Sequence, residues 1–400
     1  MHGLSLNFGY LPIGIDIGAG GAKLLQFRRS GGELMLAASS RVELPALAGR
    51  ADDAGRITTL VQTVAERVRS GGFRGSRCVI SVDDRWLRTR SVRQPQMPAQ
   101  DIDRAARLDA PGRLGFAEGE PAEIGWLRAG EVRQGDDTRD ELIYVGSLRG
   151  PLEHLVYTLA EQGLRPVAIE PGFQACTRWF TRSLRRAADQ TSVRLIVDIG
   201  LLSTGVMLTR GRSVAFYKQL EVGGAAMTKA ASERLGLDPV MVEDLRRQRK
   251  LQDYGGEPVD PKVDRALFDA VRPLIGDLAH EVSLCLRYYS VTFRGAKPEV
   301  CYLAGGEGAE PRLSESFQES LHLPASVGRP FEGVRVEGAA GSGIRGAGCE
   351  WGVAAGLSLR TRDEARSSNT VPGRRSADFA GSAPGPVAMT RSPDAAREAA

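Results

Sequence analysis

The tripeptide Asp-Ile-Gly occurs twice in this 400-residue chain, at residues 16–18 and again at 198–200. Each copy ends an apolar stretch typical of a buried strand, and each precedes a turn and a second apolar stretch. One copy alone often marks nothing more than a turn, since Asp commonly follows a strand. Two copies in matching contexts, about 180 residues apart, predict a duplicated α/β domain with a cleft between two lobes.

The segments around the two tripeptides repeat the same layout. Residues 13–42 predict strands joined by glycine-rich turns, and residues 193–220 predict the same strand-turn-strand pattern. Apolar residues at helical spacing predict helices at 54–69, 151–162, 224–235, 239–249, about 260–290 and 349–360. A strand at 299–304 ends in Gly305-Gly306. The whole is an α/β chain of two lobes.

A different pattern of predicted strands and helices between the two tripeptides predicts an inserted α+β subdomain. It holds strands at 86–94, 123–132 and 141–148 and a helix at 99–109. The predicted boundaries are 12–84 and 149–190 for the first lobe, 85–148 for the subdomain and 191–358 for the second lobe. Residues 361–400 are rich in Ser, Pro, Ala, Arg and Gly and lack periodicity, so we expect a disordered tail.

Composition argues against several classes of function. The net charge is only +4, with basic and acidic residues interleaved, so no nucleic-acid partner is expected. None of the five cysteines lies in a CxxC pair, and the four histidines are scattered, so neither a zinc site nor a disulfide framework is predicted. No apolar run is long enough to span a membrane. We therefore expect a cytoplasmic protein whose association with a membrane is through a partner.

Glycine turns and carboxylates predict a nucleotide in the cleft. The turn at 18–22 contains Gly18, Gly20 and Gly21, whose backbone N–H groups can approach phosphate oxygens, and Lys23 adds a cation. Asp16 and Asp198 can hold Mg²⁺ through its water shell. Gly305 and Gly306 can pass close to a base and ribose. The competing interpretation of these glycines is ordinary loop geometry.

Four stretches of the sequence carry a resemblance to a known family. They are IGIDIGAGGAKLLQF, RSVRQPQMPAQDIDRAARLDA, LAEQGLRPVAIEPGFQA and VDIGLLSTGVMLTRGRSVAFYKQLEVGGAAMT. In this order they resemble the PilM family, the cytoplasmic actin-like proteins of type IV pilus assembly, over roughly residues 12–358. The resemblance implies a duplicated actin-like (ribonuclease H-like) ATPase fold. It also implies that a groove beside the inserted subdomain binds the N-terminal peptide of a PilN-like inner-membrane protein, next to other pilus platform or motor components.

The resemblance also assigns site residues. Asp16, Gly18 and Lys23 match the first phosphate motif, and Asp198, Gly200, Ser203 and Thr204 match the second. Gly223 and Gly224 start the next helix, Glu243 and Arg247 flank the adenine and ribose, and Gly305 and Gly306 form the adenosine turn. Glu170 resembles the acid of a Glu-Pro pair that orders the attacking water, and Asp198 is the second catalytic candidate. The implied cofactors are ATP and Mg²⁺.

Because of two departures from the family pattern, the sequence does not decide whether the chain hydrolyses ATP. Ala19, Gly20 and Gly21 stand where serines are usual, and Leu201 and Leu202 replace small or hydroxylated residues. Fewer side chains can then donate to phosphate, so the chain is either a weak Mg-ATPase or a pseudo-ATPase scaffold. A filament-forming ATPase resembling FtsA and a small-molecule kinase of the same superfamily remain as alternatives.

A basic cluster at the end of the helix predicted at 239–249 has two interpretations. It consists of Arg246, Arg247, Arg249 and Lys250. The first is that these cations complement the helix dipole. The second is that they contact a nucleotide phosphate or an acidic partner.

Overall fold

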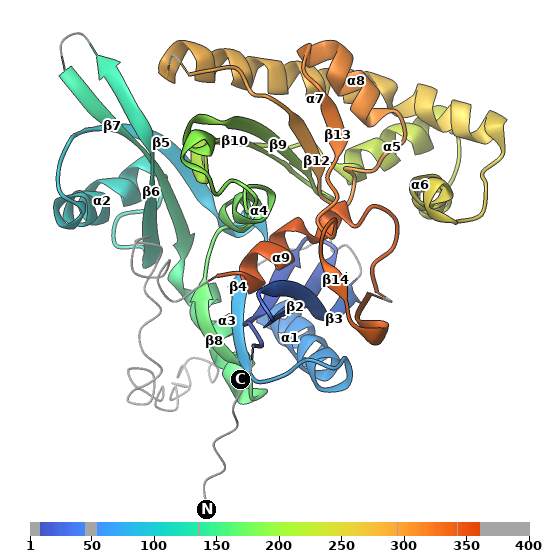
Figure 1. Ribbon diagram of the computed structural model, residues 1–400, viewed down its shortest axis with the longest axis horizontal. Helices are drawn as coiled ribbons and strands as arrows, with labels where there is room; N and C mark the ends of the chain where they lie inside the picture. Colours follow the sequence, from blue (N-terminus) through green and yellow to red (C-terminus); the bar gives the residue numbers. More distant parts are fainter. Residues whose placement is uncertain (1–8, 45–53, 135–136, 294, 342, 361–400) are drawn as a thin grey trace, which may run out of the picture.

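The computed structural model describes residues 9–44, 54–134, 137–293, 295–341 and 343–360. The tail predicted at 361–400 lies outside the described residues. Three sheets organise the chain, and Figure 1 shows the two larger ones in a lower and an upper body, with the third at the side. Among the described helices, none is long and apolar enough to cross a membrane.

The first sheet has the strand order β14-β3-β2-β1-β4-β8. Its strands are β1 (Ile13–Gly18), β2 (Gly21–Ser30), β3 (Glu33–Glu43), β4 (Arg77–Ser81), β8 (Arg165–Ile169) and β14 (Arg335–Val336). Helices α1 (Ala54–Ser70) and α3 (Arg149–Glu161) pack together on one face. The buried residues of α1, such as Ile57, Leu60 and Val64, recur at helical spacing and meet Ile13 and Ile15 of β1.

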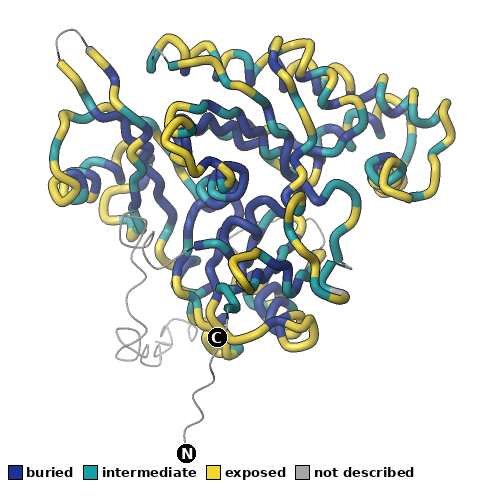
Figure 2. Tube along the Cα trace, in the orientation of Figure 1, coloured by how far each residue is buried: buried dark blue, intermediate teal, exposed yellow. Residues whose placement is uncertain are grey.

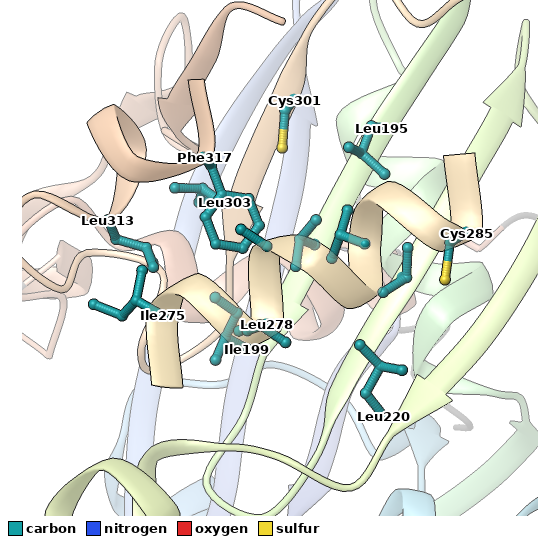
Figure 3. Packing of buried hydrophobic residues seen from close by; sticks show 14 of the residues in the cluster. Leu195, Ile199, Leu220, Ile275, Leu278, Cys285, Cys301, Leu303, Leu313 and Phe317 are labelled. Atoms are coloured by element: carbon teal, nitrogen blue, oxygen red, sulfur yellow. The ribbon is translucent and has the colours of Figure 1, made fainter. Parts of the chain in front are cut away.

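The second sheet repeats this plan with the order β11-β10-β9-β12-β13. Its strands are β9 (Val193–Ile199), β10 (Thr204–Arg210), β11 (Ser213–Leu220), β12 (Cys301–Ala304) and β13 (Ala325–Val327). Four helices accompany it: α5 (Gly224–Leu235), α6 (Pro239–Leu251), α7 (Pro261–Phe293) and α8 (Leu313–Leu321). Figure 3 shows Ile275 and Leu278 of α7 packed between the sheet and α8, which gives this lobe its own core.

The two Asp-Ile-Gly segments occupy equivalent places in the two sheets. β1 pairs antiparallel with β2 and parallel with β4, and β9 pairs antiparallel with β10 and parallel with β12. Both aspartates therefore lie near the carboxyl end of a central strand, where ligands of α/β sheets commonly bind. The duplication predicted from the repeated tripeptide is confirmed in the fold.

The third sheet belongs to the segment between β4 and α3. After the short 3₁₀ helix η1 (Asp84–Trp86), strands β5 (Arg88–Pro95), β6 (Ala122–Gln134) and β7 (Asp137–Leu148) pair in the order β5-β7-β6. Helix α2 (Ala99–Arg113) covers one face through Ile102, Ala106 and Ala110, which pack on Leu142 and Tyr144. This segment thus buries a small core of its own.

Two helices lie where the lobes meet: α4 (Gly172–Phe180) and α9 (Gly352–Ser358). They pack against each other so closely that a Cβ on Gly356 would lie 1.8 Å from the carbonyl oxygen of Ala175. Both helices are almost entirely buried, as the dark centre of Figure 2 shows. Short 3₁₀ helices complete the described chain: η2 (Ala187–Thr191), η3 (Gln252–Tyr254), η4 (Gly338–Gly341) and η5 (Cys349–Trp351).

The end of the described chain does not stay with the second sheet. β14 pairs with β3, and α9 packs on β1 and β2 of the first sheet. The boundary placed at 191–358 assigned this whole stretch to the second lobe, whereas in the structure β14 and α9 lie against the first sheet. No turn or composition signal marks this return, because β14 pairs with a strand 300 residues earlier and α9 packs on strands more than 320 residues earlier.

Candidate functional site

The two Asp-Ile-Gly turns meet at one cavity of about 240 Å³ between the lobes, called the cleft below. Ten of the predicted site residues line it: Asp16, Gly18, Gly20, Gly21, Lys23, Asp198, Gly200, Ser203, Gly305 and Gly306. They come from the β1–β2 turn, the β9–β10 turn and the turn after β12. Residues more than 280 positions apart are thus brought to one place by the duplicated fold.

Three further predicted residues support the second turn without lining the cleft. The buried Thr204 donates its hydroxyl to the carbonyl oxygen of Val222, at 2.6 Å. Gly223 and Gly224 begin α5, where the N–H of Gly224 donates to Gly200 at 3.0 Å. A Cβ on Gly223 would lie 2.6 Å from the carbonyl oxygen of Gly200, so only glycine permits this packing.

Glu243 and Arg247 are not brought to the cleft. Both are exposed on α6, and Arg247 pairs with the neighbouring Asp244 at 2.5 Å. Helix α6 starts where Asp238 caps it and Pro239 takes its first position. That start turns Arg246, Arg249 and Lys250 toward the protein instead.

These three cations bind the acidic residues that follow Gly305 and Gly306 in the turn after β12. Arg246 contacts Glu307 at 2.5 Å and Glu310 at 2.8 Å, and Arg249 contacts Glu310 at 2.6 Å. Lys250 reaches Glu307 at 3.0 Å and the carbonyl oxygen of Gly306 at 3.1 Å. Burial acts to raise the pKa of Glu307, but Lys250 and Arg246 outweigh it and lower that pKa. Three of the four residues of the basic cluster, all but Arg247, therefore form an internal ion-pair network at one end of the cleft.

Glu170 also lies away from the cleft. Its side chain is fully buried and is held by two arginines, Arg178 at 2.5 Å and Arg360 at 2.8 Å. The carboxylate that was expected to order a water is thus taken up by guanidinium groups. The Glu-Pro pair resembles a catalytic motif because it also opens a helix, α4, and the partners that redirect it come from α4 and from the far end of the chain.

Asp16 is fixed on two sides at the end of β1. Ser81 of the parallel strand β4 donates to its Oδ1 at 2.8 Å, and Lys23 of β2 contacts its Oδ2 at 3.1 Å. Strand register explains both contacts, since Lys23 and Ser81 are the direct neighbours of Asp16 on either side. Lys23 therefore neutralises an aspartate and lines the cleft at the same time.

A third carboxylate, Asp84, lines the cleft and was not predicted. Ser203 of the opposite lobe donates to its Oδ2 at 3.4 Å. Burial, followed by repulsion from Asp198, Asp83 and Asp16, raises the pKa of Asp84 to about 7. Its place in the sequence could have predicted this role. Asp84 follows β4, the parallel neighbour of β1, so the carboxyl ends of both strands lie at the same edge of the sheet.

Asp198 shares this crowded electrostatic environment. Burial first, and then repulsion from Asp16, raise its pKa to about 6, while Lys23 acts in the opposite direction. The cleft thus concentrates negative charge that Lys23 only partly offsets. A divalent cation bound there would remove this conflict, because a bound cation favours the ionised form of nearby carboxylates.

The cleft fits a magnesium nucleotide in its general chemistry. Gly18 and Gly306 have open space where a Cβ would lie, so a ligand can approach the backbone closely. Among the described residues, no group of three acidic, histidine or cysteine side chains is arranged to hold a metal alone. Mg²⁺ would therefore take part of its shell from water and phosphate, as it commonly does, with Asp16 and Asp198 as the protein groups beside it.

The pKa of Asp84 leads to a testable pH dependence. Because its pKa is raised on folding, ionised Asp84 costs stability above about pH 4, and the cost is complete above about pH 7. We expect Asp84→Asn to increase the free energy of unfolding by about 1–3 kcal/mol at pH 8 and by clearly less at pH 5. Urea unfolding at both pH values measures this. Exposed Asp244→Asn serves as control, and an equal effect of Asp84→Asn at both pH values would contradict the assignment.

A second cavity, of about 310 Å³, lies between the third sheet and the first lobe and is called the groove below. It is lined by Trp126 and Leu127 of β6, Leu152 and Val156 of α3, and residues 166–169 of β8. Both β6 and β8 are edge strands of their sheets. Leu87 also lines it, whereas Trp86 and Phe116 are buried in the neighbouring cores.

Comparison with known proteins identifies the family. Among solved structures, a chain of a PilM-PilN type IV pilus biogenesis complex is similar with a TM-score of 0.71 and 23% identity, covering 87% of this chain and 98% of that one. The ethanolamine utilization protein EutJ from Carboxydothermus hydrogenoformans is similar with a TM-score of 0.51 and 14% identity, over 88% and 89% of the two chains. No curated protein sequence matches. The family model described as type IV pilus assembly protein PilM matches residues 14–362, and the chain therefore belongs to this family of actin-like proteins.

Proposed function

We propose that the protein is a cytoplasmic scaffold of a type IV pilus machine, or of a related secretion machine, and binds the N-terminal peptide of a PilN-like inner-membrane protein in the groove. Other platform or motor components would then assemble on the same scaffold. The groove carries the proposal, because it lies where the family resemblance expects the peptide. The similar chain in the PilM-PilN complex supports the choice of partner.

The groove suits an extended peptide better than a compact ligand. Edge strands on two sides offer unpaired backbone groups, so a peptide can bind as an added strand. Leu127, Leu152 and Val167 provide apolar contacts for alternate side chains. Val167 of β8 is 37% exposed and lines the groove, so a bound peptide can contact it.

Peptide binding can be measured directly. A labelled synthetic peptide from the N-terminus of the host's PilN-like protein should bind the wild type, followed by fluorescence anisotropy. We expect Val167→Asp to weaken binding at least about tenfold, because it places a charge in the apolar groove. Val240→Asp, a change of the same kind at an exposed site on α6, should leave the affinity unchanged. Equal affinity for wild type and Val167→Asp would rule out the groove.

We further propose that the cleft binds ATP with Mg²⁺. The glycine turns on both sides of the cleft and its excess of negative charge support this proposal. Leu201 and Leu202 in the second turn, however, leave few hydroxyl donors for phosphate. With few hydroxyl donors for phosphate, the site suits binding of a nucleotide better than its rapid turnover. Glu170, held by two arginines, is not in place to order an attacking water.

Nucleotide binding has its own test. A fluorescent ATP analogue titrated with Mg²⁺ should bind the wild type, and Asp198→Asn should weaken it about tenfold because a neighbour of the metal is lost. When EDTA removes Mg²⁺, Asp198→Asn should no longer bind the analogue more weakly than the wild type, since the Asp198 carboxylate then only repels phosphate. Asp244→Asn is again the control. If the wild type binds no analogue at millimolar concentration, a pseudo-ATPase scaffold remains and the groove proposal is unaffected.

A further inference from the structure

The described chain ends beside the groove. Arg360, its last described residue, is 7% exposed and contacts Glu170 at 2.8 Å. Glu170 in turn lines the groove together with Pro171. Whatever follows Arg360 therefore starts next to this cavity, and 40 further residues follow.

Part of that following segment has the chemistry of a groove ligand. Residues 384–389, Pro-Gly-Pro-Val-Ala-Met, form an uncharged stretch with two prolines and two large apolar side chains. Proline fixes φ in the extended region, which lowers the entropy lost when a peptide binds in extended form. The remaining apolar side chains of the segment, Val371 and Phe379, have an arginine or an aspartate within three residues, unlike Val387.

The groove matches such a stretch. Proline-rich peptides commonly bind grooves lined by aromatic rings and apolar side chains. Here Trp126 lines the groove, and its ring is fixed because its N–H donates to Asp103 at 2.8 Å. Leu127 and Val167 extend the apolar surface on the two edge strands.

The linker between Arg360 and residues 384–389 is long enough for the segment to contact the groove. The linker from residue 361 to 383 contains 23 residues. A linker of that size can span at most about 75 Å, and short flexible linkers give effective concentrations of about 1 mM. A stretch with an intrinsic dissociation constant near 0.1 mM would then occupy the groove about ten times more often than it leaves it empty.

We propose that residues 384–389 bind in the groove of the same chain and so compete with the partner peptide. The competition depends on the proposed function, whereas the binding of the segment itself does not. In cells, a partner at high local concentration on the membrane would displace the segment. The scaffold is then kept from binding unrelated apolar peptides until its partner is present.

The test uses the full chain and a labelled synthetic peptide of residues 380–392. The double variant Val387→Asp/Met389→Asp leaves every described residue intact and should bind this peptide about tenfold more tightly than the wild type, because its own segment no longer competes. Adding Val167→Asp to the double variant should abolish that binding. Equal affinity of wild type and double variant, or binding that survives Val167→Asp, would overturn the proposal.

The PilN-like peptide separates this inference from the function. If that peptide binds wild type and double variant equally, the competition is refuted and the scaffold function stands. If it binds neither protein while the 380–392 peptide binds the double variant, the scaffold function fails and the internal contact stands. A wild type that binds the PilN-like peptide about tenfold more weakly than the double variant supports both.

Discussion

Replacing Arg249 by methionine is expected to lower the free energy of unfolding by about 3–5 kcal/mol. The side chain of Arg249 is fully buried and binds Glu310 at 2.6 Å and Asp264 at 2.7 Å. Methionine keeps most of the apolar contact of the stem but leaves the fully buried Glu310 with Arg246 as its remaining basic partner. A buried charge that has lost part of its compensation is far more costly than an exposed one.

Arg247 provides the matched control on the same helix. It is exposed and pairs with its exposed neighbour Asp244, so Arg247→Met should change stability by less than about 0.5 kcal/mol. Urea unfolding of both variants at pH 7 gives the comparison. If Arg247→Met costs as much as Arg249→Met, the orientation of α6 is different from that described. The pair therefore tests which face of α6 belongs to the protein interior.

A loss of similar size, about 3–5 kcal/mol, is expected for Arg178→Met. The Glu170 carboxylate is fully buried and, among the described residues, would retain Arg360 as its basic partner. Arg178 also donates to the carbonyl oxygen of Gly356 at 2.9 Å, so the variant loosens the contact between α4 and α9 as well. Arg104→Met, at an exposed site on α2, is the control and should be nearly neutral.

The ion pairs of Glu170 with Arg178 and Arg360 allow a test of whether Glu170 is a structural or a catalytic residue. Glu170→Gln should lower stability, because it removes the charge that two arginines compensate, and should change the affinity for the fluorescent ATP analogue less than about twofold. Single-turnover hydrolysis, if the protein hydrolyses ATP, should also be unaffected when measured well below the melting temperature. A variant of wild-type stability that has lost hydrolysis would return Glu170 to the catalytic role expected from its motif.

The elements of the cleft were predictable because their signals are local. Each Asp-Ile-Gly joins a buried strand to a tight turn, and the duplication fixes where two such turns meet. Helix α5 was placed at 224–235 from apolar spacing and glycines, and the structure gives the same bounds. Motif and periodicity were enough wherever a residue's role depends on neighbours close in the chain.

The errors concern partners distant in sequence. Glu243 and Arg247 lie on the predicted helix, but whether their face or that of Arg246 and Arg249 is buried depends on acids some 60 residues later. Glu170 meets Arg360 across 190 residues. Asp84 becomes a cleft residue only because β4 lies beside β1. Single-sequence periodicity contains no information about which charges will meet.

The return of the chain to the first sheet has a consequence for biosynthesis. The hydroxyl of Ser358 donates to the carbonyl oxygen of Pro12 at 2.8 Å and accepts from the amide of Phe27 at 3.1 Å. Helix α9 therefore packs on a sheet whose first strands lie near the start of the chain. At ribosomal speeds of about 5–20 residues per second, those strands wait on the order of 20–70 s for their last partner. During translation the nascent first lobe therefore presents an uncovered apolar surface until α9 has been made. Chaperone demand should therefore fall on the part of this protein that is made first.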